Sequence, residues 1–426
     1  EVIDGNGNAT RNEYDRLNRL VATATNPNDG DPNAPPAAPK ADDIVVANAY
    51  DDSGNLVKVT DGEGHITGFR YDGLSRKTRT IWDEGSTPNV ERVEQATFDG
   101  IVQLTRTDPL GRLTTYQYDD LHRLENILYT AAATDNRHYD YDLVGNLLAV
   151  TYPNDAGSVR ESGQLFDKLN RLIEETSAGA THVHTYDKAN NRKSTVYAET
   201  ARTLVSTYDK LNRLLTLTET GPGAAGPATA GYGYDLNGNI SRKILPNGTE
   251  SRCTFDAVNR KLSETSLKSG GTDVSAFDYS HPVAPYPTGY DNVGNVLKVV
   301  EQYGHASVKN RTVTNAYDRT YRLDIETIIE TGGSTTVTDY AYDEANNRTG
   351  KTVTVNGGTP TVWTFTLGTF AEGYNSNQIK SASEGATTIM FLYDLNGNRS
   401  EKQVGGVITQ TYTWDHENRL TKVTDT

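Results

Sequence analysis

The chain contains few apolar residues for its length. Hydrophobic residues make up 35% of the 426 positions, and phenylalanine occurs 8 times against 25 tyrosines. Because no run of about 18 apolar residues is present, we expect no membrane-spanning helix. The N-terminal residues Glu1-Val-Ile-Asp4 also lack the charged and apolar regions of a signal peptide. The sequence ends at Thr426 just after a turn motif, and we therefore expect a piece of a longer chain.

Cysteine and positive charge are also scarce. Cys253 is the single cysteine, which excludes an internal disulfide framework and leaves the cellular compartment open. Since no nucleophile motif surrounds it, we expect a half-buried strand thiol. The 41 Lys and Arg residues are outnumbered by 56 Asp and Glu, so the net charge is −15. This balance disfavours nucleic acid and anionic membranes as partners.

Helical periodicity is missing along the whole sequence. Segments such as Leu56–Thr60 and Lys351–Val355 instead alternate between β-branched or apolar residues and polar ones. Alternation with a period of two is typical of half-buried strands. We therefore expect an all-β protein with almost no helix.

One motif recurs fifteen times: an aromatic residue directly followed by aspartate, with Asn or Arg four places after that aspartate. The copies often lie roughly 20 to 27 residues apart, a spacing that indicates a repeat array. The aromatic residues are Tyr14, Tyr50, Tyr71, Tyr118, Tyr141, Phe166, Tyr186, Tyr208, Tyr234, Phe255, Tyr290, Tyr317, Tyr342, Tyr393 and Trp414.

The motif predicts a hairpin turn, with the aspartate as position i. Position i+3 is Gly or Asn in twelve of the fifteen copies, the exceptions being Ser75, His122 and Tyr321. Aspartate at position i accepts backbone hydrogen bonds, and Gly or Asn tolerates a left-handed backbone at i+3. We call these the aromatic-Asp turns.

A second set of turns has similar chemistry but lacks the preceding aromatic residue. These turns are Asp4–Gly7, Asp61–Gly64 and Asp108–Gly111, and each ends seven residues before an aromatic-Asp pair. Gly248 follows the same spacing before Phe255. One repeat is therefore predicted to contain two strands and two turns.

The repeats predict one continuous array over residues 1–426. Three irregular stretches, near 21–43, 221–231 and 281–289, are expected to be loop insertions that project from the sheet. The segment Tyr374–Gln378, inside the long gap between Tyr342 and Tyr393, is interpreted as a decayed copy of the motif.

Candidate sites for chemistry are weak. The Asp235–Asn239 and Asp394–Asn398 segments have acidic and amide spacing like the start of a calcium loop, but their glycine stands at position four instead of six. His182 and His184 would share one face of a strand, yet no third metal ligand is evident, and we expect surface pairing. Nucleophile-elbow and phosphate-loop spacings are absent. We therefore predict no catalytic residue, no cofactor and no metal.

The recurrent tyrosines and arginines have competing interpretations. The tyrosines could stack on sugar rings, but their fixed place beside a turn favours packing against neighbouring repeats. The arginines after the turns are expected to pair with the repeat aspartates instead of lining a lumen. They include Arg19, Arg123, Arg171, Arg213 and Arg419.

The motif resembles the YD-repeat or Rhs family over nearly the whole chain, in copies such as Tyr14–Leu20, Tyr208–Leu214 and Tyr50–Asn55. The resemblance implies a long antiparallel sheet that spirals into a hollow shell, as in bacterial Rhs toxins, insecticidal toxin complexes and teneurins. Bacterial members close the array with a self-cleaving segment and a toxin domain, and neither is found here. Asp108–Arg112 superficially resembles part of that segment, but it lies mid-array and we expect no cleavage there.

The resulting prediction is a structural, non-catalytic shell segment that is secreted or displayed at a bacterial cell surface. The expected partners are an enclosed C-terminal toxin or another protein cargo absent from this chain, and further copies that associate through open sheet edges. The alternative is a cell-surface adhesion or carbohydrate-binding module that uses exposed tyrosines and projecting loops to hold glycans.

Overall fold

The computed structural model describes residues 2–25, 44–86, 91–130, 135–153, 159–222, 226–269, 273–303, 309–369, 374 and 377–426. These residues form 35 strands of an antiparallel sheet and contain no α-helix. The all-β antiparallel prediction is therefore confirmed. Within the described ranges, no helix is long and apolar enough to cross a membrane.

The strands are short and follow one another closely. Their bounds are β1 Val2–Ile3, β2 Ala9–Tyr14, β3 Leu20–Thr25, β4 Ile44–Tyr50, β5 Leu56–Thr60, β6 Ile66–Tyr71, β7 Lys77–Trp82, β8 Arg92–Asp99, β9 Val102–Thr107, β10 Leu113–Tyr118, β11 Leu124–Tyr129, β12 Arg137–Tyr141, β13 Leu147–Pro153, β14 Val159–Phe166, β15 Leu172–Ser177, β16 Ala180–Tyr186, β17 Arg192–Tyr197, β18 Arg202–Tyr208, β19 Leu214–Thr220, β20 Ala228–Tyr234, β21 Ile240–Ile244, β22 Glu250–Phe255, β23 Lys261–Leu267, β24 Asp273–Asp278, β25 Lys298–Tyr303, β26 Lys309–Tyr317, β27 Leu323–Glu330, β28 Thr335–Tyr342, β29 Arg348–Val355, β30 Thr361–Leu367, β31 Ile379–Glu384, β32 Thr387–Tyr393, β33 Arg399–Val404, β34 Val407–Trp414 and β35 Leu420–Asp425.

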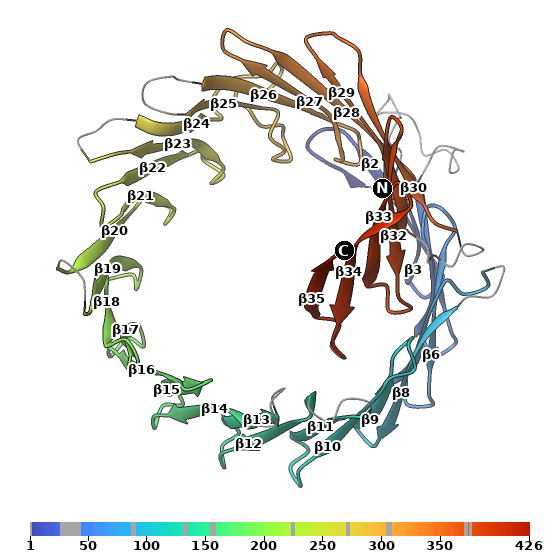
Figure 1. Ribbon diagram of the computed structural model, residues 1–426, viewed down its shortest axis with the longest axis vertical. Coiled ribbons are helices and arrows are strands. Elements are labelled where there is room, and N and C mark those ends of the chain that lie inside the picture. The colour runs from blue at the N-terminus through green and yellow to red at the C-terminus, as the bar shows by residue number, and fades with distance from the viewer. Residues whose placement is uncertain are drawn as a thin grey trace. The chain divides into compact units, whose positions relative to one another are not determined.

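The chain divides into two compact units. Unit 1 comprises residues 1–114, 290–298 and 312–426, and unit 2 comprises residues 115–289 and 299–311. In unit 2, each strand from β11 to β24 pairs antiparallel with the next along the chain. Figure 1 shows these strands side by side in chain order, in a single layer.

Unit 1 contains two such meanders that are far apart in the sequence. Strands β1 to β9 pair in chain order. Strands β27 to β35 do the same. The prediction that residues 1–426 form one continuous array stays a prediction.

The predicted turn is present at all fifteen aromatic-Asp pairs. In each copy the N–H of residue i donates to the carbonyl of i+4, and the N–H of i+3 donates to the carbonyl of i. Position i+3 has a positive φ in every copy, from 58° at Asn170 to 100° at Gly294, and this includes Ser75, His122 and Tyr321. The pairing shifts by one residue just before the aromatic residue, for example between Thr207 and Tyr208. This is a tight turn closed by a bulge.

Parts of the first two predicted loop insertions belong to strands. Residues 21–25 belong to β3, while 26–43 lie outside the described residues. Residues 228–231 belong to β20. The third stretch, 281–289, lacks a strand and has one isolated bridge between Val283 and Tyr286.

Burial is modest for a chain of this size. Among the described residues no large side chain is fully buried, and the least exposed positions include Thr80, Thr195 and Thr338 as well as Ile81 and Val313. Most strand residues are only half-buried. Among the described residues there is therefore no continuous apolar core, and we attribute much of the stability of the sheet to its turns and cross-strand pairs.

Replacing Gly238 tests the turn assignment. Gly238 has φ of 92°, whereas Leu236 in the same turn is fully exposed. We expect Gly238→Val to lower the free energy of unfolding by about 1–3 kcal/mol, because a β-branched residue strains at positive φ. Leu236→Val should change it by less than about 0.5 kcal/mol. Urea unfolding of both variants checks this, and equal stabilities would refute the assignment.

Candidate functional site

In each aromatic-Asp turn, one carboxylate oxygen binds backbone N–H groups and the other binds the i+4 side chain. In the turn of Asp235, Oδ1 accepts hydrogen bonds from the backbone N–H of Asn237 and of Asn239, both at 2.9 Å. Oδ2 accepts from the side-chain Nδ2 of Asn239, also at 2.9 Å. Hydrogen bonds from Asn239 lower the pKa of Asp235 and outweigh the opposing effect of burial. Both oxygens therefore accept hydrogen bonds within the turn itself, as the turn interpretation of Asp235–Asn239 expects.

Arginine at i+4 fills the same role as asparagine and adds charge. The Nε of Arg171 donates to Oδ2 of Asp167 at 2.7 Å. Ion pairs of this kind join all five predicted arginines to the aspartate of their own turn, which confirms the pairing prediction; they are Arg19, Arg123, Arg171, Arg213 and Arg419. Both allowed residues at i+4 can therefore donate to Oδ2.

The i+4 side chain also reaches the next aromatic-Asp turn. Nη1 of Arg123 donates to the backbone carbonyl of Asp142 at 2.8 Å, and its guanidinium lies 4.7 Å from the ring centre of Tyr141. Asparagine has a shorter side chain and contacts the i+3 side chain of the next turn, as between Asn191 Nδ2 and Asn212 Oδ1 at 2.9 Å. Successive turns are thus coupled along one margin of the sheet.

The aromatic residue completes the link in the opposite direction. The hydroxyl of Tyr234 donates to the carbonyl of Leu214 at 2.8 Å, where Leu214 follows the i+4 residue of the preceding turn. The same contact is made by Tyr50, Tyr141, Tyr186, Tyr208, Tyr317, Tyr342 and Tyr393, and by the indole N–H of Trp414. The prediction that the aromatics pack against neighbouring repeats is confirmed.

The decayed copy is present, but it begins earlier than predicted. The N–H of Gly368 donates to the carbonyl of Gln378, as residue i does to i+4, and Asn377 has φ of 64°. Leu367 and Gly368 therefore take the aromatic and aspartate places, and an insertion separates them from Asn377. Tyr374, which the sequence suggested as the aromatic, is buried within that insertion.

In unit 1, the turns without an aromatic residue lie against later aromatic-Asp turns. We call the turns that begin at Asp4, Asp61 and Asp108 the wedge turns, and their contacts with residues 291–418 the seam. Asn6 Nδ2 of the first wedge turn donates to Asp291 Oδ2 at 2.8 Å, and Asn292 Nδ2 donates to the carbonyl of Gly5 at 2.6 Å. The seam joins residues that are 281 to 317 positions apart in the sequence.

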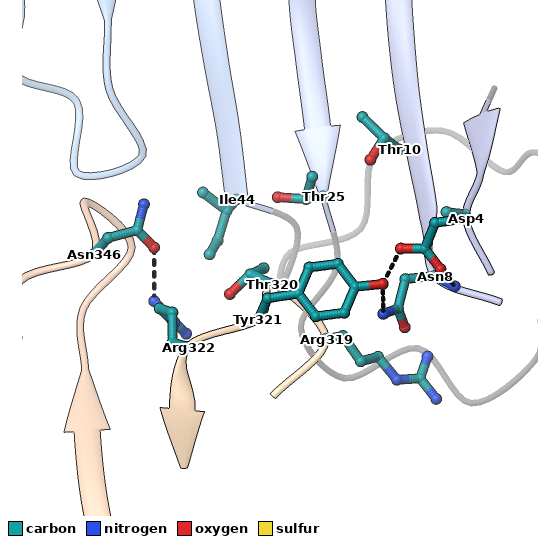
Figure 2. A pocket seen from close by; sticks show the side chains of 11 residues that line it. Asp4, Asn8, Thr10, Thr25, Ile44, Arg319, Thr320, Tyr321, Arg322 and Asn346 are labelled. Carbon is teal, nitrogen blue, oxygen red and sulfur yellow. Dashed lines mark hydrogen bonds between the residues drawn. The ribbon is translucent and has the colours of Figure 1, made fainter. Parts of the chain in front are cut away.

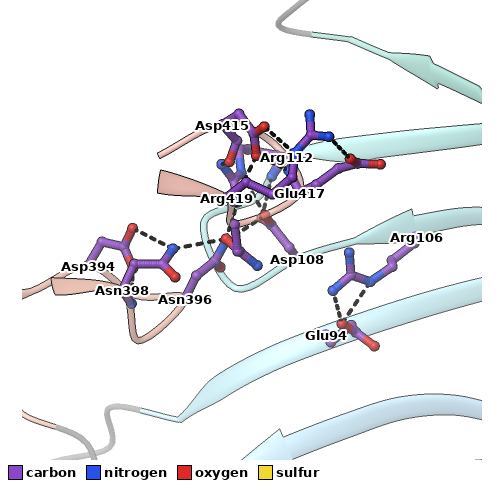
Figure 3. A network of polar contacts seen from close by, with 11 residues as sticks. Glu94, Arg106, Asp108, Arg112, Asp394, Asn396, Asn398, Asp415, Glu417 and Arg419 are labelled. Carbon is purple, nitrogen blue, oxygen red and sulfur yellow. Dashed lines mark hydrogen bonds and ion pairs between the residues drawn. The ribbon is translucent and has the colours of Figure 1, made fainter. Parts of the chain in front are cut away.

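Each wedge turn contacts two successive turns of the later repeats. Around the third one, Asn396 Nδ2 donates to Asp108 Oδ2 at 2.9 Å (Figure 3). Arg112 then donates to the carbonyl of Asp415 at 3.1 Å and to Asn418 Oδ1 at 3.0 Å. Arg112 thus makes the contacts that an i+4 arginine makes on the next aromatic-Asp turn. Asp108–Arg112, which superficially resembles part of a cleavage segment, is one of these seam turns.

The second wedge turn approaches its neighbours most closely. A Cβ at Gly62 would overlap the carbonyl oxygen of Glu344, and a Cβ at Gly5 would lie 3.0 Å from that of Asn292. Glycine at i+1 is the one sequence signal that could have indicated this seam. It is ambiguous, since Gly73 holds the same place in its own turn and meets nothing within 4 Å.

A cavity of about 330 Å³ lies beside the first wedge turn. Figure 2 shows Tyr321 reaching across it from the later repeats toward Asp4 and Asn8. Thr10, Thr25 and Ile44 line the side of the first repeats, and Arg319 and Arg322 line the other.

The two histidines do not form the surface pair that the sequence suggested. They do share a face, since His182 Nδ1 lies 3.1 Å from Glu175 Oε1 and His184 Nε2 lies 3.6 Å from the same atom. His184, however, is only 3% exposed, and its Nδ1 lies 3.0 Å from Thr195 Oγ1. Burial, then the charge of Arg192, lowers the pKa of His184. Across the described ranges, no group of three His, Cys, Asp or Glu residues is arranged to hold a metal.

Cys253 lies on β22 and is half-buried, as expected. Burial raises the pKa of its thiol, which keeps the thiolate, the nucleophilic form, scarce at neutral pH.

Comparisons with known proteins agree with this geometry. The RHS Repeat family profile matches residues 50–86 and 103–134. No curated protein sequence matches the chain. The crystal structure of TcdB2-TccC3-Cdc42 is similar over 97% of this chain and 22% of that chain, with a TM-score of 0.70 and 15% identity. The Photorhabdus luminescens Tc holotoxin pore with a TccC3 variant is similar over 98% and 24%, with a TM-score of 0.58 and 14% identity. At these identities the likeness is one of fold.

Acidification tests the seam through Asp108, which is 5% exposed. Burial acts to raise its pKa, but hydrogen bonds from Asn396 and Arg112 outweigh this and lower it. The stabilisation is therefore present above the unfolded pKa of about 3.9 and is lost as the pH falls through the lower folded value. We expect Asp108→Asn to cost about 1–3 kcal/mol at pH 7.

That cost should begin to shrink below about pH 4, because the carboxylate of the unfolded wild type is then protonated first, and it should be lost once the pH falls below the lower folded pKa. Urea unfolding at several pH values measures it, with Asp52→Asn, at an exposed neighbour of a turn aspartate, as a near-neutral control. A cost that stays constant or grows toward acid would contradict the seam contact.

Proposed function

We propose that the chain is an array of RHS repeats beyond the residues 50–86 and 103–134 that the family profile matches, and that it is a structural, non-catalytic segment of a protein wall that houses a cargo. The observation that carries the proposal is the combination of a single-layer sheet in unit 2 with the near absence of deep burial among the described residues. A single-layer sheet with half-buried residues on both faces can act as a wall between two compartments, because it does not require a second layer packed against it.

The seam supports the proposal, because a wall has to be continuous between adjacent turns of the chain. In unit 1 the wedge turns fill the spaces between later turns and bind them through side-chain amides, carboxylates and Arg112. Such polar contacts between turn margins join two stretches of sheet while leaving both sheet faces free.

The proposed cargo is a protein, such as a toxin domain, that is absent from this chain. Both similar solved structures contain TccC3, in one case within a Tc holotoxin pore, and this chain spans 22% and 24% of the chains compared. By analogy we propose a secreted or surface-exposed location in a bacterium, further self-association through sheet edges, and no cofactor or metal.

The alternative of a glycan-binding module receives less support from the geometry. Sugar binding by the repeat tyrosines would require free ring faces and hydroxyls. In eight aromatic-Asp copies, however, the tyrosine hydroxyl donates to the preceding repeat, and an arginine covers several of the rings, as Arg213 covers Tyr234 at 4.4 Å. These side chains already serve to join repeats.

The wall proposal is tested by electron cryomicroscopy of this chain, expressed and purified together with the polypeptide that the adjacent coding sequence encodes. We expect a curved layer one sheet thick around an interior that holds the downstream segment, which should resist added protease until the wall is unfolded by urea. A solid particle, or a downstream segment digested at the same rate as when expressed alone, would reject the proposal.

A further inference from the structure

Tyr321 is an unusual residue for its position, because a bulky side chain occurs there at the left-handed backbone conformation. Position i+3 carries Gly or Asn in twelve of the fifteen aromatic-Asp turns, but in the turn of Asp318 it carries Tyr321 with φ of 66°. A bulky residue is seldom found at positive φ, and such outliers persist where surrounding contacts compensate for them. An asparagine there would satisfy the turn at lower cost.

The compensating contacts lie across the seam. The Tyr321 hydroxyl donates to Asp4 Oδ2, and Asn8 Nδ2 donates to the same hydroxyl at 2.9 Å (Figure 2). Burial, reinforced by the hydrogen bond to Asp4, raises the pKa of Tyr321 to about 12, so the hydroxyl keeps its proton at physiological pH. The backbone N–H of Tyr321 therefore closes its own turn, whereas its side-chain hydroxyl binds both ends of the first wedge turn.

The other wedge turns show which role Tyr321 fills. Asn377, at i+3 of its turn, donates to Asp61 Oδ2 at 3.1 Å, and Asn418, also at i+3, accepts from Arg112 at 3.0 Å. At the first wedge turn a cavity lies beside the contact, and the longer tyrosine side chain reaches across it to Asp4 and Asn8. At all three wedge turns, an i+3 side chain of a later turn therefore contacts the wedge turn: Tyr321 and Asn377 donate to its aspartate, and Asn418 accepts from its arginine.

The segment held by this contact has few hydrogen bonds within its own sheet, and its other contacts with the later repeats include those of Gly5 and Asn6 with residues 291 and 292. Strand β1 has only two residues, Val2 and Ile3, both exposed, and it pairs with β2 through two positions. The hydroxyl of Tyr321 binds the turn that joins β1 to β2.

We propose that Tyr321 is a positioning residue that fastens the first hairpin, β1 and β2, to the later repeats and so closes one end of the seam. The assignment rests on the proposed wall function for its purpose, since an open seam would breach a wall. The contact itself is measured independently of any cargo, so its failure and that of the wall proposal are distinguishable.

Hydrogen-exchange mass spectrometry of the full chain tests the assignment with three variants. Tyr321→Phe keeps the ring and removes the hydroxyl, and Tyr321→Asn also relieves the backbone. His122→Asn is the matched control, because His122 is at i+3 of an aromatic-Asp turn in unit 2, with φ of 59°. We expect amide exchange over residues 2–14 to become about tenfold faster in both Tyr321 variants, the effect of losing one hydrogen bond to a charged acceptor.

In Tyr321→Asn, amides of residues 318–322 should keep or gain protection, since asparagine suits the left-handed position. His122→Asn should leave residues 2–14 unchanged. If residues 2–14 keep wild-type exchange in both Tyr321 variants, the hydroxyl does not fasten the hairpin. If the two segments lose protection together in Tyr321→Asn, Tyr321 serves only its own turn, and the assignment is likewise overturned.

Discussion

The aspartate at position i of each aromatic-Asp turn is the group on which the rest of the structure depends. One carboxylate oxygen closes the turn by accepting backbone N–H groups, and the other orients the i+4 side chain. That side chain then contacts the next turn, whose aromatic residue in turn hydrogen-bonds to the repeat before it. Local turn geometry and coupling between repeats are therefore set by the same residue.

This coupling explains how a long sheet holds together with little buried apolar area. Stability in a repeat array is approximately a sum over repeats and their nearest neighbours. Here the neighbour contribution comes from charge-assisted hydrogen bonds, cation–π contacts and tyrosine hydroxyls, while the threonine-rich strands supply cross-strand pairs. The same kinds of contact occur in the seam. Arg112 donates to the carbonyl of Asp415, as an i+4 arginine donates to the aspartate carbonyl of the next turn in its own meander.

The sequence is most informative about contacts within about five residues. The turn prediction holds even at Ser75, His122 and Tyr321, because the aspartate and the backbone hydrogen bonds favour the left-handed conformation at i+3, and contacts across the seam add to this at Tyr321. The pairing of Arg171 with Asp167 was predictable for the same reason. Both contacts depend on spacing alone, and spacing is visible in a sequence.

Contacts across hundreds of residues were not predictable in this way. The wedge turns differ from ordinary hairpin turns only by what they meet, and Gly5 and Gly62 signal a close approach no more clearly than Gly73. The burial of His184 depends on neighbouring strands, and the insertion around Tyr374 hides a turn whose first residues are Leu367 and Gly368. In each case the deciding partner lies outside the local motif.

A double-mutant cycle between Arg322 and Tyr342 tests most directly whether aromatic-Asp turns are coupled. Arg322 pairs with Asp318, donates to the carbonyl of Asp343 at 2.8 Å and lies 4.9 Å from the ring centre of Tyr342. We expect Arg322→Ala and Tyr342→Ala to show a coupling of about 0.5 kcal/mol or more in urea unfolding. Arg322→Ala with Tyr393→Ala, in a different turn, should be additive. Additive effects for the Arg322 and Tyr342 pair would contradict the account.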